Sequence, residues 1–165
     1  MIHLLAPGPS MSQSLASSFT GQHVGVVGNC FELVPSALFL ASSDGQWWDM
    51  HPQAYQFNGR KFSVHPHPLP DVIQIDIPTN TNSGVLALEV AKRLGFKAIT
   101  LHGFDMHGTH YFGEYTNGLV NTREHTRRRH LQQYRDWALV NPELRVINAT
   151  AGSMIDCFER MEAMA

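Results

Sequence analysis

The sequence is poor in cysteine and in charged residues, and it contains no long apolar run. Asp, Glu, Lys and Arg make up 16% of the 165 residues, whereas an average soluble domain has about 25%. The formal net charge of −2 leaves no basic excess, so general binding to DNA or RNA is not expected. No run reaches the roughly 18 apolar residues that a membrane span requires, so we expect no span. The two thiols, Cys30 and Cys157, lack C-x-x-C spacing, which favours a reducing cytoplasm over a disulfide scaffold.

What the sequence does contain is enough apolar material for one core. Apolar residues make up 43% of the chain, and this length suits one compact domain, which we place at residues 1–165. Ten histidines stand beside twelve Lys and Arg residues. We therefore expect any pH dependence to centre near the ordinary histidine pKa of about 6.5.

Six short apolar runs, separated by turns rich in Gly, Pro and Ser, predict strands. They are mostly continuous rather than alternating, which is typical of parallel strands buried on both faces. The runs are 2–6, 24–27, 37–41, 72–75, 99–101 and 145–147. A helix is expected at 84–94, between Ser83 as N-cap and Gly95. A second is expected at 121–140, with Leu131, Tyr134 and Ala138 on one stripe, ended by Asn141-Pro142. This order predicts an α/β fold, a Rossmann-like three-layer sandwich with a mostly parallel central sheet.

Ligands of such a sheet bind beyond the carboxyl ends of its strands, so the polar residues that follow each run form the candidate site. Gly8 allows close backbone approach, and Ser10 could cap a helix whose N-terminus holds a phosphate. The residues expected to bind a nucleotide are Gly8, Pro9, Ser10, Asn29, Ser43, Asp44, Asn82, Ser83, Gly84 and Gly103. A second helix N-terminus, after Asn82, would complete a site of diphosphate size. Each of these turns could also serve only to connect a strand to a helix.

The densest polar cluster, residues 102–110, follows the fifth run. Asp105, His107 and His110 could form a general acid/base set, and Glu114 in the Gly-rich and aromatic stretch after them could act as a base. The histidines could instead be loop residues bonded to the backbone. Imidazole and carboxylate also suit a transition metal, but HExxH-type helical spacing is absent, and we predict no metal site.

For three further features, the sequence allows either contact with a ligand or a purely structural role. At most one or two of the consecutive arginines 127–129 can face the crevice, because three neighbours span most of a helical turn. Trp47 or Trp48 could stack on a base or pack in the core. Residues 58–70, with an Asn-Gly turn and three prolines, are the least regular stretch and a candidate flap.

The order of these motifs resembles that of the bacterial sialyltransferases that include the Campylobacter lipooligosaccharide enzymes. The resemblance covers most of the chain and rests on Gly8-Pro9-Ser10, Asn29, Ser43-Asp44, Asn82-Ser83-Gly84, Gly103-Phe104-Asp105 and His110-Tyr111-Phe112-Gly113. It implies a Rossmann-like domain that binds a cytidine monophosphate sugar, with the Gly-Pro-Ser turn near the phosphate. The sequence is also similar to MptE-like pterin pyrophosphokinases and to short bacteriophage proteins with a GFDMHG…HYFG pattern. If the protein is encoded by a phage, the expected location is the cytoplasm of the bacterial host cell.

The sequence departs from the sialyltransferase pattern in three places. Glu114 stands where the family has its general base His, Pro7 stands where it has a donor-contacting Asn, and the lid insertion is replaced by residues 106–109. We expect a glycosyltransferase-like protein that binds a nucleotide or nucleotide sugar and requires no cofactor. The alternatives are nucleotide binding without catalysis and a Mg²⁺-dependent pyrophosphokinase, in which Asp44 and Asp105 would face the metal. The sequence leaves open whether the chain forms a homo-oligomer.

Overall fold

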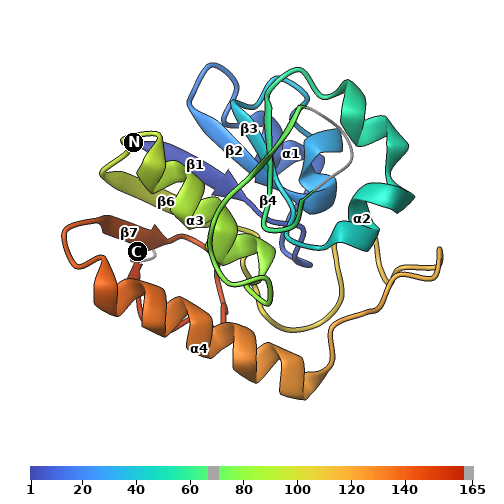
Figure 1. The fold of residues 1–165 in the computed structure, drawn as a ribbon. Helices are drawn as coiled ribbons and strands as arrows, with labels where there is room; N and C mark the ends of the chain where they lie inside the picture. Colours follow the sequence, from blue (N-terminus) through green and yellow to red (C-terminus); the bar gives the residue numbers. More distant parts are fainter. Residues whose placement is uncertain (67–70, 162–165) are drawn as a thin grey trace.

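A single parallel sheet of eight strands organises the computed structural model, which describes residues 1–66 and 71–161 (Figure 1). The strands are β1 (Ile2–Leu5), β2 (Val24–Val27), β3 (Phe39–Ala41), β4 (Arg60–Ser63), β5 (Val72–Gln74), β6 (Ala98–His102), β7 (Arg145–Asn148) and β8 (Glu159–Arg160). Their order across the sheet is β5-β4-β3-β2-β1-β6-β7-β8, and every strand pair is parallel. The prediction of an α/β fold with a parallel sheet is confirmed.

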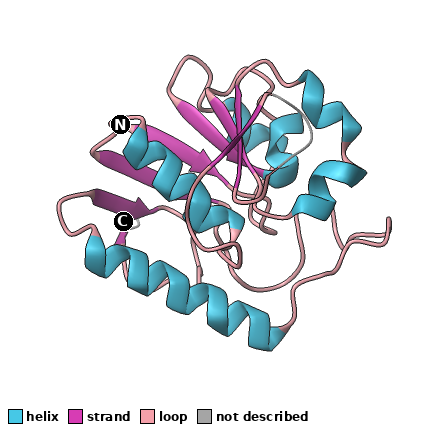
Figure 2. Ribbon diagram, in the orientation of Figure 1, coloured by secondary structure: helices cyan, strands magenta, loops and turns pink. Residues whose placement is uncertain are grey.

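Helices cover both faces of the sheet, which gives three layers (Figure 2). The α-helices are α1 (Gln13–Ser17), α2 (Gly45–Met50), α3 (Ser83–Arg93) and α4 (Glu124–Val140), and the 3₁₀ helices are η1 (Gly28–Glu32) and η2 (Pro52–Gln56). Successive strand residues point to opposite faces, so Leu4 packs in the core under α3 and α4, while Leu5 packs with α1 and α2. None of the helices in the two described ranges combines the length and the apolar character needed to cross a bilayer.

Helix α3 lies across the middle of the sheet and forms because its sequence is locally consistent. Asn82 is its N-cap, and the Asn82 side-chain oxygen accepts hydrogen bonds from the amides of Gly84 and Val85 at 3.0 and 3.1 Å. The expectation that Ser83 is the N-cap was wrong, because Ser83 is the first residue of the helix itself. Gly95 follows the helix with φ of +92°. This is the left-handed conformation that commonly ends a helix and that glycine adopts most easily.

Helix α4 begins three residues later than the sequence predicts, at Glu124 instead of residue 121. Of the expected row, Tyr134 is buried and Leu131 packs, partly buried, against the same core, while Trp137 is the buried residue of this face that was not expected. Trp137 is held by a hydrogen bond from its indole nitrogen to Glu89 of α3 at 3.0 Å. The two helices therefore pack together on one face of the sheet.

Two strands were not predicted. Residues 60–63 fall inside the expected flap, but Lys61 is buried, and its amine forms an ion pair with Asp71 at 3.0 Å. This pairing lets a charged residue occupy a strand inside the sheet, so the flap prediction was wrong for residues 60–63; residues 67–70 of that stretch lie outside the described ranges. The other unpredicted strand, β8, has only two residues, both exposed, and its Glu159 pairs with Arg145 of β7 at 2.9 Å.

Candidate functional site

The candidate site lies where the order of the strands reverses. From β1 the chain builds outward to β5 and then returns to place β6 on the other side of β1. In open α/β sheets this reversal leaves a crevice at the carboxyl ends of the two central strands. A cleft of about 540 Å³ opens there, lined by residues that follow β1, β2, β3, β4 and β6 and by the starts of α3 and α4.

Most of the residues selected from the sequence line this cleft. They are Gly8, Ser43, Asp44, Asn82, Ser83, Gly84, Gly103, His107, His110 and Glu114. They come from four separate segments of the chain, those after β1, after β3, at the start of α3 and after β6. Their common position at the carboxyl edge follows from the parallel sheet.

Two glycines let the loops after β1 and β6 meet at the floor of the cleft. The Gly8 amide donates to the Gly103 carbonyl at 3.0 Å. A Cβ on Gly8 would lie 2.1 Å from an Asp105 carboxylate oxygen, and a Cβ on Gly103 would lie 2.1 Å from the Ala6 carbonyl oxygen. Gly103 also has φ of +74°. Because neither glycine has a side chain, the two loops can touch each other and the floor of the cleft stays accessible.

A pair of serine hydroxyls connects β3 with α3. The Ser43 amide donates to the Ser83 hydroxyl at 2.9 Å, and the two hydroxyl oxygens lie 3.0 Å apart. Asn82 is less free, because its oxygen caps α3 while its amide nitrogen and its backbone N–H both donate to Gln133 at 2.8 Å. Asn82 therefore shapes the cleft by fixing the start of α3 against α4.

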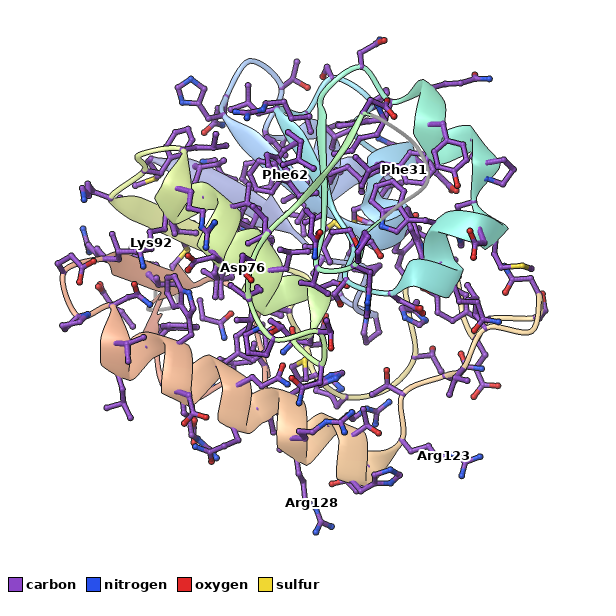
Figure 3. All side chains as sticks on the ribbon, viewed as in Figure 1. Phe31, Phe62, Asp76, Lys92, Arg123 and Arg128 are labelled. Carbon is purple, nitrogen blue, oxygen red and sulfur yellow. The ribbon has the colours of Figure 1, made fainter. Side chains whose placement is uncertain are left out.

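Two arginines of α4 contribute positive charge to the lining. Arg127 and Arg129 line the cleft, and an Arg127 guanidinium nitrogen donates to the Gly108 carbonyl. Arg128 points away from the body of the molecule, as Arg123 does (Figure 3), and pairs with Glu124 at 3.6 Å. The expectation that at most two of the three arginines face the crevice agrees with this arrangement.

The loop between β6 and α4 carries His110 within an aromatic cluster. The His110 ring stacks on Phe112, with centroids 4.7 Å apart, and lies 4.6 Å from the Tyr115 ring. His110 Nδ1 lies 3.3 Å from the Gly113 carbonyl oxygen, which can only accept, so Nδ1 carries the proton and Nε2 keeps a lone pair. Burial, together with the charge of Arg127, lowers the pKa of His110. At neutral pH this side chain is therefore an uncharged base.

Four of the expected site residues lie outside the lining. Asp105 is only 2% exposed and accepts hydrogen bonds from the Ser10 hydroxyl at 2.8 Å and the Ser10 amide at 3.3 Å. Ser10 therefore joins two loops instead of capping a helix, and the N-cap of α1 is Ser12. Pro9 is exposed beside Gly108. The start of α1 is not part of the lining, so the expected pair of helix N-termini, that of α1 with that of α3, is not formed.

Asn29, the fourth of these residues, is buried behind an aromatic wall. Its oxygen accepts from the Trp47 indole nitrogen at 2.9 Å, and its amide lies 3.2 Å from a ring nitrogen of His51. Trp47 stacks on His51, with ring centroids 4.4 Å apart, and lines the cleft. Asn29 thus orients a residue that faces a ligand rather than facing it directly.

The acidic residues of the lining do not form a metal site. Asp44 and Glu114 are both exposed, and Asp44 caps α2 through its contact with the Gln46 amide at 3.0 Å. Within the described ranges, no three His, Cys, Asp or Glu side chains are placed to hold a metal ion. His102 is directed away from this site, toward His3 and Phe19, and its burial lowers its pKa to about 4.

Sequence reasoning missed several residues of the lining, among them His65, His130 and Tyr134. His65 follows β4, which was not predicted, so it was not placed at a strand end. His130 and Tyr134 are four residues apart on α4 and so share one helix face. That spacing was the available signal, but it indicates a buried face equally well. Burial, and after it the charge of Arg129, lowers the pKa of His130 to about 4.

Comparisons of the chain with protein-family models, with curated proteins and with solved structures find no match.

Proposed function

We propose that the protein binds a nucleotide sugar in this cleft and transfers the sugar to an acceptor hydroxyl, as a glycosyltransferase-like enzyme. The observation that carries the proposal is that His110, an uncharged base with a free Nε2, lines the same cleft as the start of α3. A base and an anion-binding helix start on one cleft are the two parts that such a transfer needs.

The lining suits a nucleotide in shape and in charge. Arg127 and Arg129 together with the N-terminus of α3 attract the phosphate. Trp47 and Tyr115 offer aromatic surfaces on which a base can stack. The cavity of about 540 Å³ falls within the range of small-molecule sites.

The transfer is a direct displacement at the sugar. The acceptor oxygen forms a bond to the anomeric carbon while the bond from that carbon to the phosphate oxygen breaks, and the electron pair leaves with the phosphate. The proton of the acceptor hydroxyl moves to His110 Nε2. Arg127 and Arg129 stabilise the negative charge that collects on the departing phosphate. Glu114, exposed at the edge of the same lining, is the second candidate base.

The magnesium-dependent alternative finds less support in the positions of the carboxylates. It needs Asp44 and Asp105 on one metal ion, but Asp105 is buried against Ser10 outside the lining. We therefore expect nucleotide binding to be independent of Mg²⁺.

The test is a thermal-shift panel of CMP, CDP, UDP, ADP, GTP and NAD, each with and without Mg²⁺, followed by a turnover assay. A ligand at ~100 times its Kd should stabilise the fold by about 2.7 kcal/mol, which raises Tm by several degrees. The proposal expects a Mg²⁺-independent shift and release of the nucleotide from its sugar conjugate. A shift without turnover would indicate binding without catalysis, a shift that requires a triphosphate and Mg²⁺ would indicate the kinase-like alternative, and no shift would contradict nucleotide binding.

A further inference from the structure

Tyr134 is a buried residue whose hydroxyl faces the cleft. Its side chain is only 2% exposed, and its ring packs edge-on against Phe104 and Phe158, with centroid distances of 6.3 and 6.4 Å. In the part of the chain that the structure describes, the hydroxyl has no hydrogen-bond partner, although it belongs to the lining of the cleft. Asn141 Oδ1 is the one described side-chain atom that is fully buried without a partner, so the Tyr134 hydroxyl keeps access to the cleft, and its proton can be donated to a ligand there.

The Tyr134 hydroxyl lies against the first turn of α3. A Cβ built on Gly84 would be 1.9 Å from this oxygen, so only glycine leaves room for it. The amides of Gly84 and Val85 are already bound by Asn82. The hydroxyl therefore adds a hydrogen-bond donor at a helix start where part of the helix's own donors are in use.

The neighbouring serine pair also has one proton to donate. Ser43 and Ser83 hold two hydroxyl protons between them, and the contact of 3.0 Å between their oxygens uses one. Whichever serine donates, the hydroxyl of the other keeps its proton for a ligand. His130 lies one turn before Tyr134 on the same face of α4, and Arg129 precedes it in the chain. His130 and Arg129 both line the cleft.

We infer that Tyr134, the Ser43 and Ser83 pair and the start of α3 form an oxyanion subsite that holds a phosphate group. These groups are hydroxyls and the positive end of a helix dipole, and Arg129, five residues before Tyr134, belongs to the same lining. Such a set suits a ligand that only accepts hydrogen bonds. Burial raises the pKa of Tyr134, so the phenol stays protonated and donates at neutral pH. Of the two carboxylates of the lining, Glu114 comes from the loop after β6, and Asp44, which follows Ser43, accepts a hydrogen bond from the Gln46 amide as the N-cap of α2. The inference rests on the proposed function in one respect, since it identifies the part of the nucleotide sugar that is held there.

Tyr134→Phe tests the subsite because it removes one oxygen and keeps the ring. We expect the affinity for inorganic phosphate and for CMP to fall about tenfold or more, while the affinity for cytidine, which has no phosphate, does not change. The Tm of the ligand-free protein should change little, because the hydroxyl reaches the cleft and no hydrogen bond within the described chain is lost with it. Isothermal titration calorimetry with the three ligands, and thermal unfolding without ligand, measure these effects.

Tyr111→Phe is the matched control. The Tyr111 hydroxyl donates to the Asn29 carbonyl at 3.3 Å, and Tyr111 is not part of the cleft lining. Its removal should leave the affinity for phosphate within about twofold. A structural role for the Tyr134 hydroxyl would instead lower Tm in Tyr134→Phe and leave phosphate affinity unchanged, and that result overturns the inference.

The outcomes separate this inference from the proposed function. Phosphate binding that depends on Tyr134, without any response to CMP or to nucleotide sugars, would support the subsite and contradict the transferase. CMP binding and turnover that Tyr134→Phe leaves intact would support the transferase and overturn the subsite. Failure of the unsubstituted protein to bind either phosphate or CMP would overturn both.

Discussion

Replacing His110 by glutamine is expected to lower the rate of sugar transfer about 100-fold to 10,000-fold, the contribution typical of a general base. Glutamine keeps a polar side chain in the aromatic cluster, but it cannot accept the proton of the acceptor hydroxyl. Nucleotide affinity should stay within about threefold, because the phosphate is held from α3 and α4. Steady-state turnover of a nucleotide sugar, combined with calorimetric binding of the free nucleotide, measures both quantities.

Glu114→Gln is the comparison for His110→Gln. Glu114 is exposed at the edge of the cleft, so its loss should lower the rate less than tenfold. The reverse order, with a large loss for Glu114→Gln and a small one for His110→Gln, would show that the carboxylate is the base. Equal small losses would contradict general-base catalysis by either residue.

The pH profile of transfer gives a second readout for His110. The base must be unprotonated, and burial together with Arg127 holds its pKa below the ordinary value. The rate should therefore be constant at neutral pH and fall only as the pH drops through that lowered pKa, below about 6.5. A rate that still rises steeply above pH 7 would contradict the assignment.

Gly103→Ala is expected to destabilise the fold by about 3 kcal/mol or more. The new methyl group would lie 2.1 Å from the Ala6 carbonyl oxygen, which is backbone and cannot turn aside, and the residue would also carry φ of +74°. The expected result in chemical denaturation is a lower midpoint at an unchanged slope. Weaker nucleotide binding should accompany it, because the loops after β1 and β6 would be pushed apart.

Gly21→Ala separates the contact from the backbone strain. Gly21 has a similar φ of +81°, but a Cβ there would meet nothing within 4 Å. Its substitution should cost only about 1 to 2 kcal/mol, the price of the left-handed conformation alone. Equal losses for Gly21→Ala and Gly103→Ala would mean that the close approach of the two loops contributes nothing to stability.

The parts of the fold that local sequence determines were predicted well. Helix α3 was expected because its apolar spacing, a capping residue and Gly95 all agree within a short stretch. Strand β4 was missed because Lys61 is compensated by Asp71, ten residues away. Such a partner has no signature in the pattern around Lys61 itself.

The candidate site was predicted in its location but only partly in its membership. Asp105 follows a strand, as a site residue should, yet the chain takes left-handed conformations at Gly103 and Met106, with φ of +74° and +60°. These turns direct the Asp105 carboxylate into the protein, against Ser10. Strand periodicity cannot indicate where a side chain points after the strand has ended.

Tyr134 is a residue that the sequence places in the core but whose part in the site it does not indicate. Helical spacing identified it as a core residue, and its ring does belong to the core. Its hydroxyl nevertheless reaches the cleft, because Gly84 leaves a space at the start of α3. A pattern of apolar positions describes the ring of a tyrosine and carries no information about its oxygen.

The most direct test of the nucleotide site is a titration of the isotopically labelled protein with CMP, followed by the NMR signals of its backbone amides. A protein of 165 residues is well suited to that method. We expect the largest shift changes on Gly8, Ser83, Gly84 and Gly103, at the carboxyl ends of β1 and β6 and the start of α3. Changes confined to other surfaces, or a spectrum that CMP leaves unaltered, would contradict the assignment of this cleft as the nucleotide site.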